Sequence, residues 1–371
     1  MNYEVRTICK INSIKMTYYH EAGLIDSTDD IQFKVYSSTH PKGFIIAKPK
    51  YVPADLLSLT GLKKRFLFSK CMFRFNLFNK KEVVEKNLDA IRSKFPYYIY
   101  ECKKHQNWFL GVPEKKVKKF YDTKKGLQEL LKVPEEDLDD YLKAVRKLVD
   151  ILVEAGIPTE NLGISHSTLL GNYTPGESDI DMLIFGMDNG WKAIKHLEKY
   201  KNPSLKWKSK EDWATYYQKR VVSKVYTEEE YVANMVRKKD DGFIDGNVFS
   251  LFCIENKDES WYDWEAQHEP LGTVKINAKV KDAYHSIVRP GYYELEETKI
   301  LEGHEDVPIK RIVTWARPFS LQAKENERIE ACGLLEKVKS KEGEFYQVVI
   351  GYFDTYTTDR GEKEYLKALI S

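Results

Sequence analysis

Residues 163–186 contain the side chains best suited to chemistry. This segment joins a turn of small residues around Ser167 to an Asp-x-Asp pair, Asp179 and Asp181, at the start of an apolar run. Alternate side chains of a strand share a face, so the two carboxylates are expected to converge on one point. Such a pair calls for a cation, and Mg²⁺ or Mn²⁺ held together with substrate phosphates is the natural partner. The spacing therefore predicts metal-dependent phosphoryl or nucleotidyl transfer, with Asp179 and Asp181 as catalytic residues and metal ligands.

The elements that must position this pair are predicted from apolar patterns. Apolar residues recur at helical spacing over 138–153, until Gly156-Ile157-Pro158 stops the helix. Four further elements are expected in the order strand, short helix, strand and helix: 162–165, 167–170, 180–185 and 190–200. The aspartate pair is thus expected where a buried strand begins, shortly after a short helix.

The turn before the pair supplies the expected nucleotide contacts, which are His166, Ser167, Gly171 and Ser178. Ser167 lies at the start of the short helix, where unpaired backbone N–H groups and the helix dipole favour a phosphate. Gly171 permits the turn that follows. We therefore expect a triphosphate to rest against this helix start.

These motifs resemble the DNA polymerase beta-like nucleotidyltransferase superfamily, and in particular its minimal nucleotidyltransferases. The family's signature is a strand ending in Gly-Ser or Gly-Gly, a short helix, and Asp-x-Asp on the next strand. Here Ser167 precedes Asp179 by 12 residues, which is inside the family's range. The resemblance implies a metal-dependent enzyme that moves a nucleoside monophosphate from a nucleoside triphosphate to an acceptor hydroxyl.

Two positions depart from the family pattern. His166 replaces the glycine that precedes the serine, so an imidazole stands where the family prefers no side chain. A third carboxylate is often supplied by a later strand, but the expected strand over 247–254 contains no acid, and only Asp245 and Glu255 flank it. A chain of this kind could be slow, or could bind a nucleotide without turnover.

Two other interpretations of the turn were weighed. Gly163-Ile164-Ser165-His166-Ser167 begins like the nucleophile elbow of a serine hydrolase, but the elbow needs glycine where Ser167 stands. The Ser-Asp-Ile-Asp sequence could also be a polar turn that merely enters a strand, as most Asp-x-Asp triplets do. The upstream turn and the helical frame favour the nucleotidyltransferase interpretation.

Composition indicates an ordinary soluble globular protein of two or three domains. The chain has 371 residues, of which 42% are hydrophobic and 31% charged. Its five cysteines are scattered and form no Cys-x-x-Cys, so neither a zinc site nor a disulfide framework is expected. No secretory signal and no apolar stretch near 18 residues is found, which predicts a cytoplasmic protein without a membrane partner.

Charge is distributed unevenly. Residues 40–132 contain 22 lysines and arginines against 8 aspartates and glutamates, so the remainder of the chain is acidic. Aromatic residues interleave with the cations over 63–68 and 73–75, the usual equipment for single strands or RNA ends. The alternative is that these aromatics form the inward face of strands, with lysines in solvent. A second basic stretch, 115–122, is expected on a helix.

Three regions follow, which predict an α+β multidomain protein. Residues 1–132 form a basic α+β module that could bind RNA, with strands over 31–36 and 43–47. Residues 133–270 form the nucleotidyltransferase core, a small mixed sheet with helices and a helical insertion. Residues 271–371 are rich in short strands, which suggests a small antiparallel barrel, possibly one that binds oligonucleotides.

The whole chain also resembles a family of archaeal predicted nucleotidyltransferases. The motifs that carry this resemblance are His40-Pro41, Tyr51-Val52-Pro53, Arg317-Pro318-Phe319 and Gln322. That family's activity is inferred from its fold, so the resemblance implies nucleotidyl transfer without an acceptor. The basic N-terminal region favours RNA as the acceptor; the alternatives are an inert nucleotide- or RNA-binding protein of the same fold, or a docking component of a larger assembly.

Overall fold

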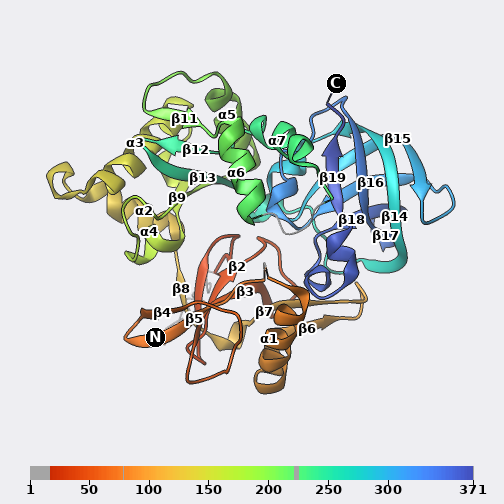
Figure 1. Ribbon diagram of the computed structural model, residues 1–371, viewed down its shortest axis with the longest axis horizontal. Coiled ribbons are helices and arrows are strands. Elements are labelled where there is room, and N and C mark those ends of the chain that lie inside the picture. The colour runs from red at the N-terminus through yellow and green to blue at the C-terminus, as the bar shows by residue number, and fades with distance from the viewer. Residues whose placement is uncertain (1–16, 78, 221–224, 371) are drawn as a thin grey trace, which may run out of the picture.

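The computed structural model describes residues 17–77, 79–220 and 225–370. It is an α+β protein in which three sheets and seven α-helices are found among these residues. Figure 1 shows the sheets as three groups, with the N-terminal sheet below, the central sheet at upper left and the C-terminal strands at right. The α+β class predicted from the sequence is confirmed.

The N-terminal sheet has eight strands in the described residues, ordered β4-β5-β3-β2-β1-β8, with β7 pairing β3 and β6 pairing β7. The strands are β1 (Leu24–Ser27), β2 (Gln32–Val35), β3 (Phe44–Pro53), β4 (Lys64–Leu67), β5 (Lys70–Arg74), β6 (Ile99–Cys102), β7 (Asn107–Pro113) and β8 (Val117–Tyr121). Helix α1 (Lys81–Lys94) buries Val84, Leu88 and Ile91, which recur at helical spacing. The helix expected over 115–122 is wrong, because this segment is strand β8, which pairs with β1.

The central sheet has the order β11-β12-β13-β10-β9. Its strands are β9 (Leu162–Ile164), β10 (Ile180–Phe185), β11 (Leu205–Trp207), β12 (Asp241–Ile244) and β13 (Asn247–Ile254). Strand β10 runs parallel to β13 and antiparallel to β9, so the sheet is mixed. The strands expected over 162–165, 180–185 and 247–254 are confirmed.

Six helices follow α1 in the described part of the chain: α2 (Thr123–Lys132), α3 (Asp140–Glu154), α4 (His166–Leu170), α5 (Met187–Lys199), α6 (Lys210–Arg220) and α7 (Glu228–Val236). Helices α6 and α7 pack against each other, and α7 contacts β19 of the C-terminal strands. Helix α3 begins after Asp139, whose side chain accepts a hydrogen bond from the backbone of Leu142, and buries seven residues of its apolar face. Gly156 lies just beyond its end at φ +80°, a left-handed conformation that suits glycine. Helix α5 packs against β10 and β13.

The C-terminal strands are β14 (Gln267–Asp282), β15 (Gly291–Glu302), β16 (Ile309–Thr314), β17 (Arg328–Ser340), β18 (Gly343–Ile350) and β19 (Tyr365–Ala368). Pairing proceeds from β14 through β15, β16, β18 and β17, and β17 also pairs with β14. Strand β19 pairs with β17 outside this cycle. The expectation of a purely antiparallel arrangement is wrong, because β16 and β18 are parallel.

The N-terminal and C-terminal regions share one hydrophobic core. Phe109 of β7 lies 5.5 Å from Trp315 and 5.9 Å from Phe353, measured between ring centroids. All three side chains are completely buried. The central sheet has its own core, to which α3 contributes Tyr141 and Leu148. Side chains from the first and last thirds of the chain therefore pack against each other in the same core, although they are far apart in the sequence.

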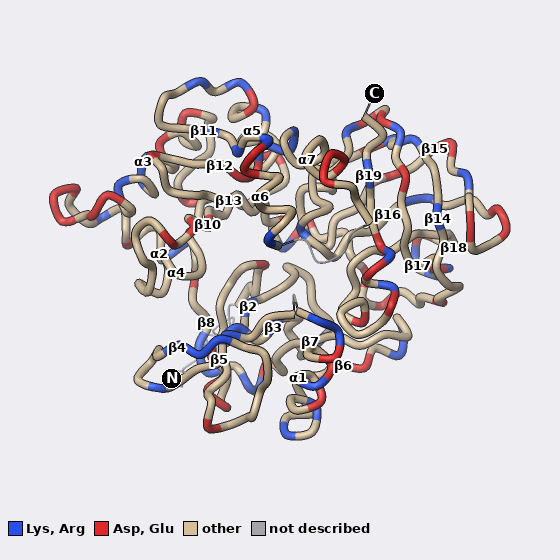
Figure 2. The backbone as a smooth tube through the Cα atoms, viewed as in Figure 1, with Lys and Arg blue, Asp and Glu red and all other residues tan. Residues whose placement is uncertain are grey.

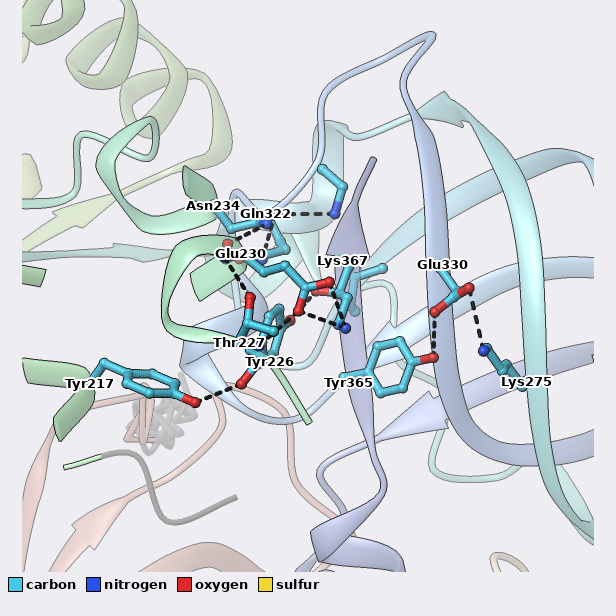
Figure 3. A network of polar contacts seen from close by, with 12 residues as sticks. Tyr217, Tyr226, Thr227, Glu230, Asn234, Lys275, Gln322, Glu330, Tyr365 and Lys367 are labelled. Atoms are coloured by element: carbon cyan, nitrogen blue, oxygen red, sulfur yellow. Dashed lines mark hydrogen bonds and ion pairs between the residues drawn. The ribbon is translucent and has the colours of Figure 1, made fainter. Parts of the chain in front are cut away.

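Helix α7 joins the central region to the C-terminal strands (Figure 3). Its Asn234 side chain accepts hydrogen bonds from the side chain of Gln322, at 3.0 Å, and from the backbone N–H of Ala368, at 3.1 Å. Glu230 of the same helix forms an ion pair with Lys367 of β19 at 3.1 Å. These contacts hold the helical insertion against β19.

Short 3-10 helices connect several of these elements: Pro96–Tyr98, Glu114–Lys116, Glu135–Asp137, Thr159–Asn161, Lys257–Glu259, Tyr284–Ile287, Arg317–Phe319, Phe353–Tyr356 and Asp359–Glu362. Among the helices of the described residues, none combines the length and apolar character that crossing a bilayer requires.

Candidate functional site

A row of polar side chains crosses three strands of the central sheet. Asp181, the second residue of β10, pairs with Ser250 of β13, and Ser250 pairs with Asp241 of β12. Directly paired residues project from the same face of a sheet. The Ser250 hydroxyl donates a hydrogen bond to the Asp241 carboxylate. The sheet therefore presents two carboxylates, one on each side of a serine, on one face.

Asp179 directly precedes β10 and is exposed. Its backbone carbonyl accepts a hydrogen bond from the Tyr141 hydroxyl at 3.0 Å, and that hydroxyl also lies 2.7 Å from the Thr168 hydroxyl of α4. The α3 tyrosine thus ties the start of β10 to the short helix. Asp179 is the last residue before the strand and Asp181 is its second residue; the Asp179 residue is exposed, whereas the Asp181 side chain is 16% exposed.

His166 contacts Asp181 directly. The imidazole Nδ1 lies 2.7 Å from a carboxylate oxygen of Asp181, and both side chains are largely buried, at 12% and 16% exposure. His166 also has φ +51°, a left-handed backbone conformation that L-residues adopt at a cost. The backbone at His166 thus has a conformation that glycine would adopt without strain, and the imidazole at this position reaches the aspartate.

The two partners differ in charge at neutral pH: the His166 imidazole is neutral and the Asp181 carboxylate is ionised. Burial lowers the pKa of His166 to about 3, although the Asp181 charge acts in the other direction. Burial alone would raise the pKa of Asp181, but His166, Lys34 and Lys50 together hold that pKa well below its usual range. A neutral imidazole therefore donates its Nδ1 proton to an ionised carboxylate.

The other residues of the turn have distinct positions. Ser167 is the second residue of α4, and its carbonyl accepts backbone hydrogen bonds that close the turn at Gly171 and Asn172. Gly171 ends the helix at φ +70°. The Ser178 hydroxyl accepts a hydrogen bond from the backbone N–H of Thr174 at 2.9 Å, so it closes the loop that leads to β10. Of these residues His166 contacts an aspartate, Ser167 and Gly171 form the short helix and its end, and Ser178 stabilises the loop.

Lysines of the N-terminal sheet act on Asp181. Lys34 of β2 lies directly opposite Lys48 of β3, a like-charge pairing that is unfavourable in a sheet. Strand β3 has one extra residue, Lys50, relative to β2 at this point, a bulge of the kind that redirects a side chain. Burial is the main cause that lowers the pKa of Lys34 to about 8 and that of Lys50 to about 7, while the Asp181 charge opposes both shifts.

Lys34 and Lys50 have no nearby carboxylate that forms an ion pair with them in the described residues. Within the described residues, neither Lys34 nor Lys50 has a carboxylate within 4.0 Å of its ammonium nitrogen. The Lys34 ammonium group lies 5.1 Å from the centre of the Phe252 ring. Because neither lysine is paired with an acid, the face opposite Asp181 is suited to bind an anion that carries several negative charges.

The C-terminal region adds an arginine. Arg317, just after β16, lies 3.6 Å from an oxygen of Asp241 and 3.8 Å from one of Asp240, and its guanidinium lies 4.2 Å from the centre of the Phe252 ring. Burial would raise the pKa of Asp241, but Arg317 and Lys208 hold it below its usual value. Cations from both outer regions therefore converge on the carboxylate row of the central sheet.

The flanking acids do not complete this row. Asp245 lies in the turn between β12 and β13, where it forms an ion pair with Lys147 of α3 at 2.8 Å. Glu255 follows Ile254, which pairs with the last residue of β10, so it lies about 16 Å along the strand from Ser250. Burial raises the pKa of Glu255 to about 8. Both candidates for a third carboxylate are therefore misplaced.

Asp241, which was not among the predicted site residues, lies opposite Ser250 and supplies the further carboxylate on this face. The signal was present in Asp245-Gly246, a dipeptide typical of two-residue hairpins. Both residues have positive φ, +45° and +81°, and Ile244 pairs with Asn247. When residues are paired outwards from this turn, Asp241 falls opposite Ser250. Ser250 in turn pairs with Asp181, so one strand separates the two aspartates.

These side chains could hold a divalent metal only if a bound phosphate supplied further oxygen ligands. Among the residues that the structure describes, no group of three or more His, Cys, Asp or Glu side chains is arranged to hold a metal ion. Mg²⁺ is commonly held by one or two carboxylates, with phosphate oxygens and waters completing its shell. Asp179 and Asp181 supply such a pair, and the facing lysines suit the phosphates.

Comparison with known proteins gives one full-length relative. The chain is 28% identical over 357 residues to an uncharacterized protein of Methanocaldococcus jannaschii, an alignment that covers 92% of this chain and 97% of the relative. No family model matches the chain, and no solved structure matches it. The relative is archaeal and similar along nearly its whole length.

Proposed function

We propose that the protein is a metal-dependent nucleotidyltransferase that moves a nucleoside monophosphate from a nucleoside triphosphate to an acceptor hydroxyl, with RNA as the expected acceptor. The observation that carries this proposal is the convergence of Lys34, Lys50 and Arg317 on the face that holds Asp181 and Asp241. Binding a metal triphosphate requires carboxylates for the metal and cations for the phosphates; Lys34 and Lys50 have no ion-pair partner among the described residues, and Arg317 is paired with Asp240 and Asp241.

The topology supports a polymerase beta-like core. Strand β9 leads through the short helix α4 and a loop to the Asp-x-Asp strand β10, which lies beside a parallel strand, β13. This is the succession that the sequence motifs implied. A third acid from β12, in place of one from β13, distinguishes this chain from the family pattern.

Each group at the site has a role in this reaction. A divalent metal bound by Asp179 and Asp181 would neutralise phosphate charge, with Asp241 available on the far side of Ser250. Lys34, Lys50 and Arg317 bind β- and γ-phosphate oxygens, and Ser167 contacts the phosphate nearest α4. These contacts place the α-phosphorus in line with the acceptor hydroxyl. A bond forms from the acceptor oxygen to this phosphorus, and pyrophosphate leaves.

The C-terminal strands support a second, finer assignment. The pairings β14-β15-β16-β18-β17 return to β14, and from this cycle we infer a small closed barrel. A five-stranded barrel with short loops is the architecture of oligonucleotide-binding domains. Such a barrel beside the site agrees with an RNA acceptor.

A catalytically inert nucleotide- or RNA-binding protein of the same fold is the second candidate. The contact between His166 and Asp181 favours it, because the imidazole takes up a carboxylate oxygen that a metal would need. In this alternative, cations from the N-terminal and C-terminal regions hold the triphosphate, and no pyrophosphate is released.

Transfer of label separates the two candidates. The purified chain would be incubated with each α-labelled nucleoside triphosphate, Mg²⁺ or Mn²⁺, and cellular RNA. An Asp179→Asn/Asp181→Asn variant removes the proposed metal site, Asp241→Asn tests the acid on β12, and Asp258→Asn, an exposed acid in a short 3-10 helix, is the matched control. Label in RNA that is lost in the double variant and kept in the control supports the enzyme; triphosphate binding without label transfer or pyrophosphate supports the inert protein.

A further inference from the structure

The hairpin of β4 and β5 exposes aromatic side chains at the edge of the N-terminal sheet. Phe66 is 79% exposed, the highest value among the large hydrophobic residues of the described chain, and Phe68 at the hairpin tip is 49% exposed. By contrast, Phe73 and Phe75 of the same sequence stretch are buried in the core that the N- and C-terminal regions share. Phe73 and Phe75 therefore form part of the core, as the strand interpretation predicted. Phe66 and Phe68 face solvent, where the RNA-binding interpretation requires aromatic rings.

The two residues at the tip of the hairpin, Phe68 and Ser69, have a backbone conformation that is unfavourable for residues other than glycine. Phe68 and Ser69 have φ +55° and +59°, and Leu67 pairs with Lys70, so the connection is a two-residue turn with both residues in the left-handed region. Glycine or asparagine is the usual choice there, and a phenylalanine costs about 1–2 kcal/mol. The Phe68 ring, which is half-exposed and lies edge-on to Tyr51 with ring centroids 6.4 Å apart, is thus present despite a conformational cost.

Cations accompany these rings. Lys63, Lys64 and Arg65 are exposed, and none of them has an acidic partner within ion-pair distance in the described parts of the chain. The Lys64 ammonium group lies 5.0 Å from the centre of the Phe73 ring. Figure 2 shows basic residues along this part of the N-terminal sheet. The hairpin therefore combines exposed positive charge with exposed aromatic faces.

The hairpin is continuous with the strand that reaches the site. Strand β5 pairs with β3, where Tyr51 lies opposite Arg74, and the backbone N–H of Phe75 bonds to the carbonyl of Lys50. Cys71, the partner of Phe66, precedes Phe75 by four residues, a separation of about 13 Å along a strand. Phe66 therefore lies on a strand that pairs with β5, and β5 pairs with the strand that carries Lys50.

We propose that the β4–β5 hairpin binds the acceptor as single-stranded RNA, with Phe66 and Phe68 stacking on unpaired bases and Lys63, Lys64 and Arg65 contacting the phosphate backbone. This inference deepens the proposed function and rests on it for the identity of the acceptor. Positive charge with exposed aromatic rings is the combination that single strands require, because phosphates meet the cations and every base has a face for stacking.

The test is fluorescence anisotropy of the full chain with a labelled single-stranded RNA, without nucleoside triphosphate. Phe66→Ala/Phe68→Ala is expected to weaken binding at least about tenfold with an unchanged salt dependence. Lys63→Gln/Lys64→Gln/Arg65→Gln is expected to reduce the slope of log affinity against log salt by up to about 2, since each single-strand phosphate contact contributes about 0.7. Leu369→Ala, which truncates an exposed apolar residue near the C-terminus, is the matched control.

Unchanged RNA affinity in both hairpin variants would overturn the inference. So would the loss, in the phenylalanine variant, of self-association in sedimentation or of binding to vesicles of equal parts phosphatidylcholine and phosphatidylserine, with RNA binding intact. Because this assay needs no turnover, it separates the two proposals. RNA binding that depends on the hairpin, without nucleotidyl transfer, would contradict only the proposed enzymatic function. Nucleotidyl transfer that the hairpin variants leave unchanged would contradict only this inference.

Discussion

At the scale of single residues, His166 is the least expected feature of the site. Its backbone is left-handed, with φ +51°, a conformation that a glycine would adopt without strain. The imidazole in turn makes a 2.7 Å contact with Asp181. The substitution was visible in the sequence, but the contact was not, because it depends on a turn that brings the ring back over β10.

Replacement of His166 separates these two contributions. His166→Gly and His166→Ala both remove the contact with Asp181, but only glycine accepts φ +51° without strain. We expect the glycine variant to be more stable than the alanine variant by about 1 kcal/mol, measured from urea unfolding midpoints. Equal stabilities, or a more stable alanine variant, would show that the backbone at this position relaxes and carries no strain.

At the scale of elements, the strongly periodic segments could be predicted and the pairing partners could not. Helix α3 and strands β10 and β13 lie close to where the apolar pattern placed them. Residues 115–122 were expected to be helical because a lysine-rich stretch gives information only about local propensity. The structure of this segment is instead determined by the pairing of β8 with β1. Asp241 was missed for the same reason: its place beside Ser250 follows from register, which the hairpin at Asp245-Gly246 sets.

The paired strands β2 and β3 lead to a prediction about pH. Lys34 and Lys50 have pKa values lowered to about 8 and about 7, mainly by burial, so they lose their charge as pH rises through this range. Affinity for a nucleoside triphosphate is therefore expected to fall from about pH 7 to about pH 9.5, where the ligand's own phosphate charge hardly changes. Titration calorimetry should also show proton uptake on binding near pH 8, since the bound anion favours the charged lysines.

The matched variant for this prediction is Lys50→Arg. Arginine stays protonated throughout this range, so the variant should retain more of its affinity at the high end than the natural chain does. Identical pH profiles for the two proteins would mean that Lys50 does not contact the phosphates.

At the scale of the whole molecule, the site belongs to no single region. Asp181 and Asp241 come from the central sheet, Lys34 and Lys50 from the N-terminal sheet, and Arg317 from the C-terminal region. Uneven charge and strand patterns were enough to predict three regions. The convergence of their side chains could not be predicted, because it depends on contacts between segments hundreds of residues apart, such as that of Phe109 with Trp315.

The contact between α7 and β19 offers a test of how these regions are held together. Asn234→Ala leaves two buried donors without an acceptor, the side chain of Gln322 and the backbone N–H of Ala368. We expect the free energy of unfolding to fall by about 3 kcal/mol, and amide exchange at β19 to accelerate. Gln267→Ala, which truncates an exposed amide side chain at the start of β14, should change the stability by less than about 0.5 kcal/mol. A similar small loss in both variants would indicate that the α7 contact does not secure β19.

The most direct test of the Asp181 site is anomalous diffraction from crystals of the full chain soaked with Mn²⁺ and a non-hydrolysable nucleoside triphosphate. The predicted result is a manganese peak bound by the Asp181 carboxylate together with Asp179 or Asp241, with the His166 ring displaced and the phosphates on Lys34, Lys50 and Arg317. A triphosphate bound elsewhere, or one bound at this site with His166 still on Asp181 and no manganese, would contradict the proposal of a metal-dependent nucleotidyltransferase.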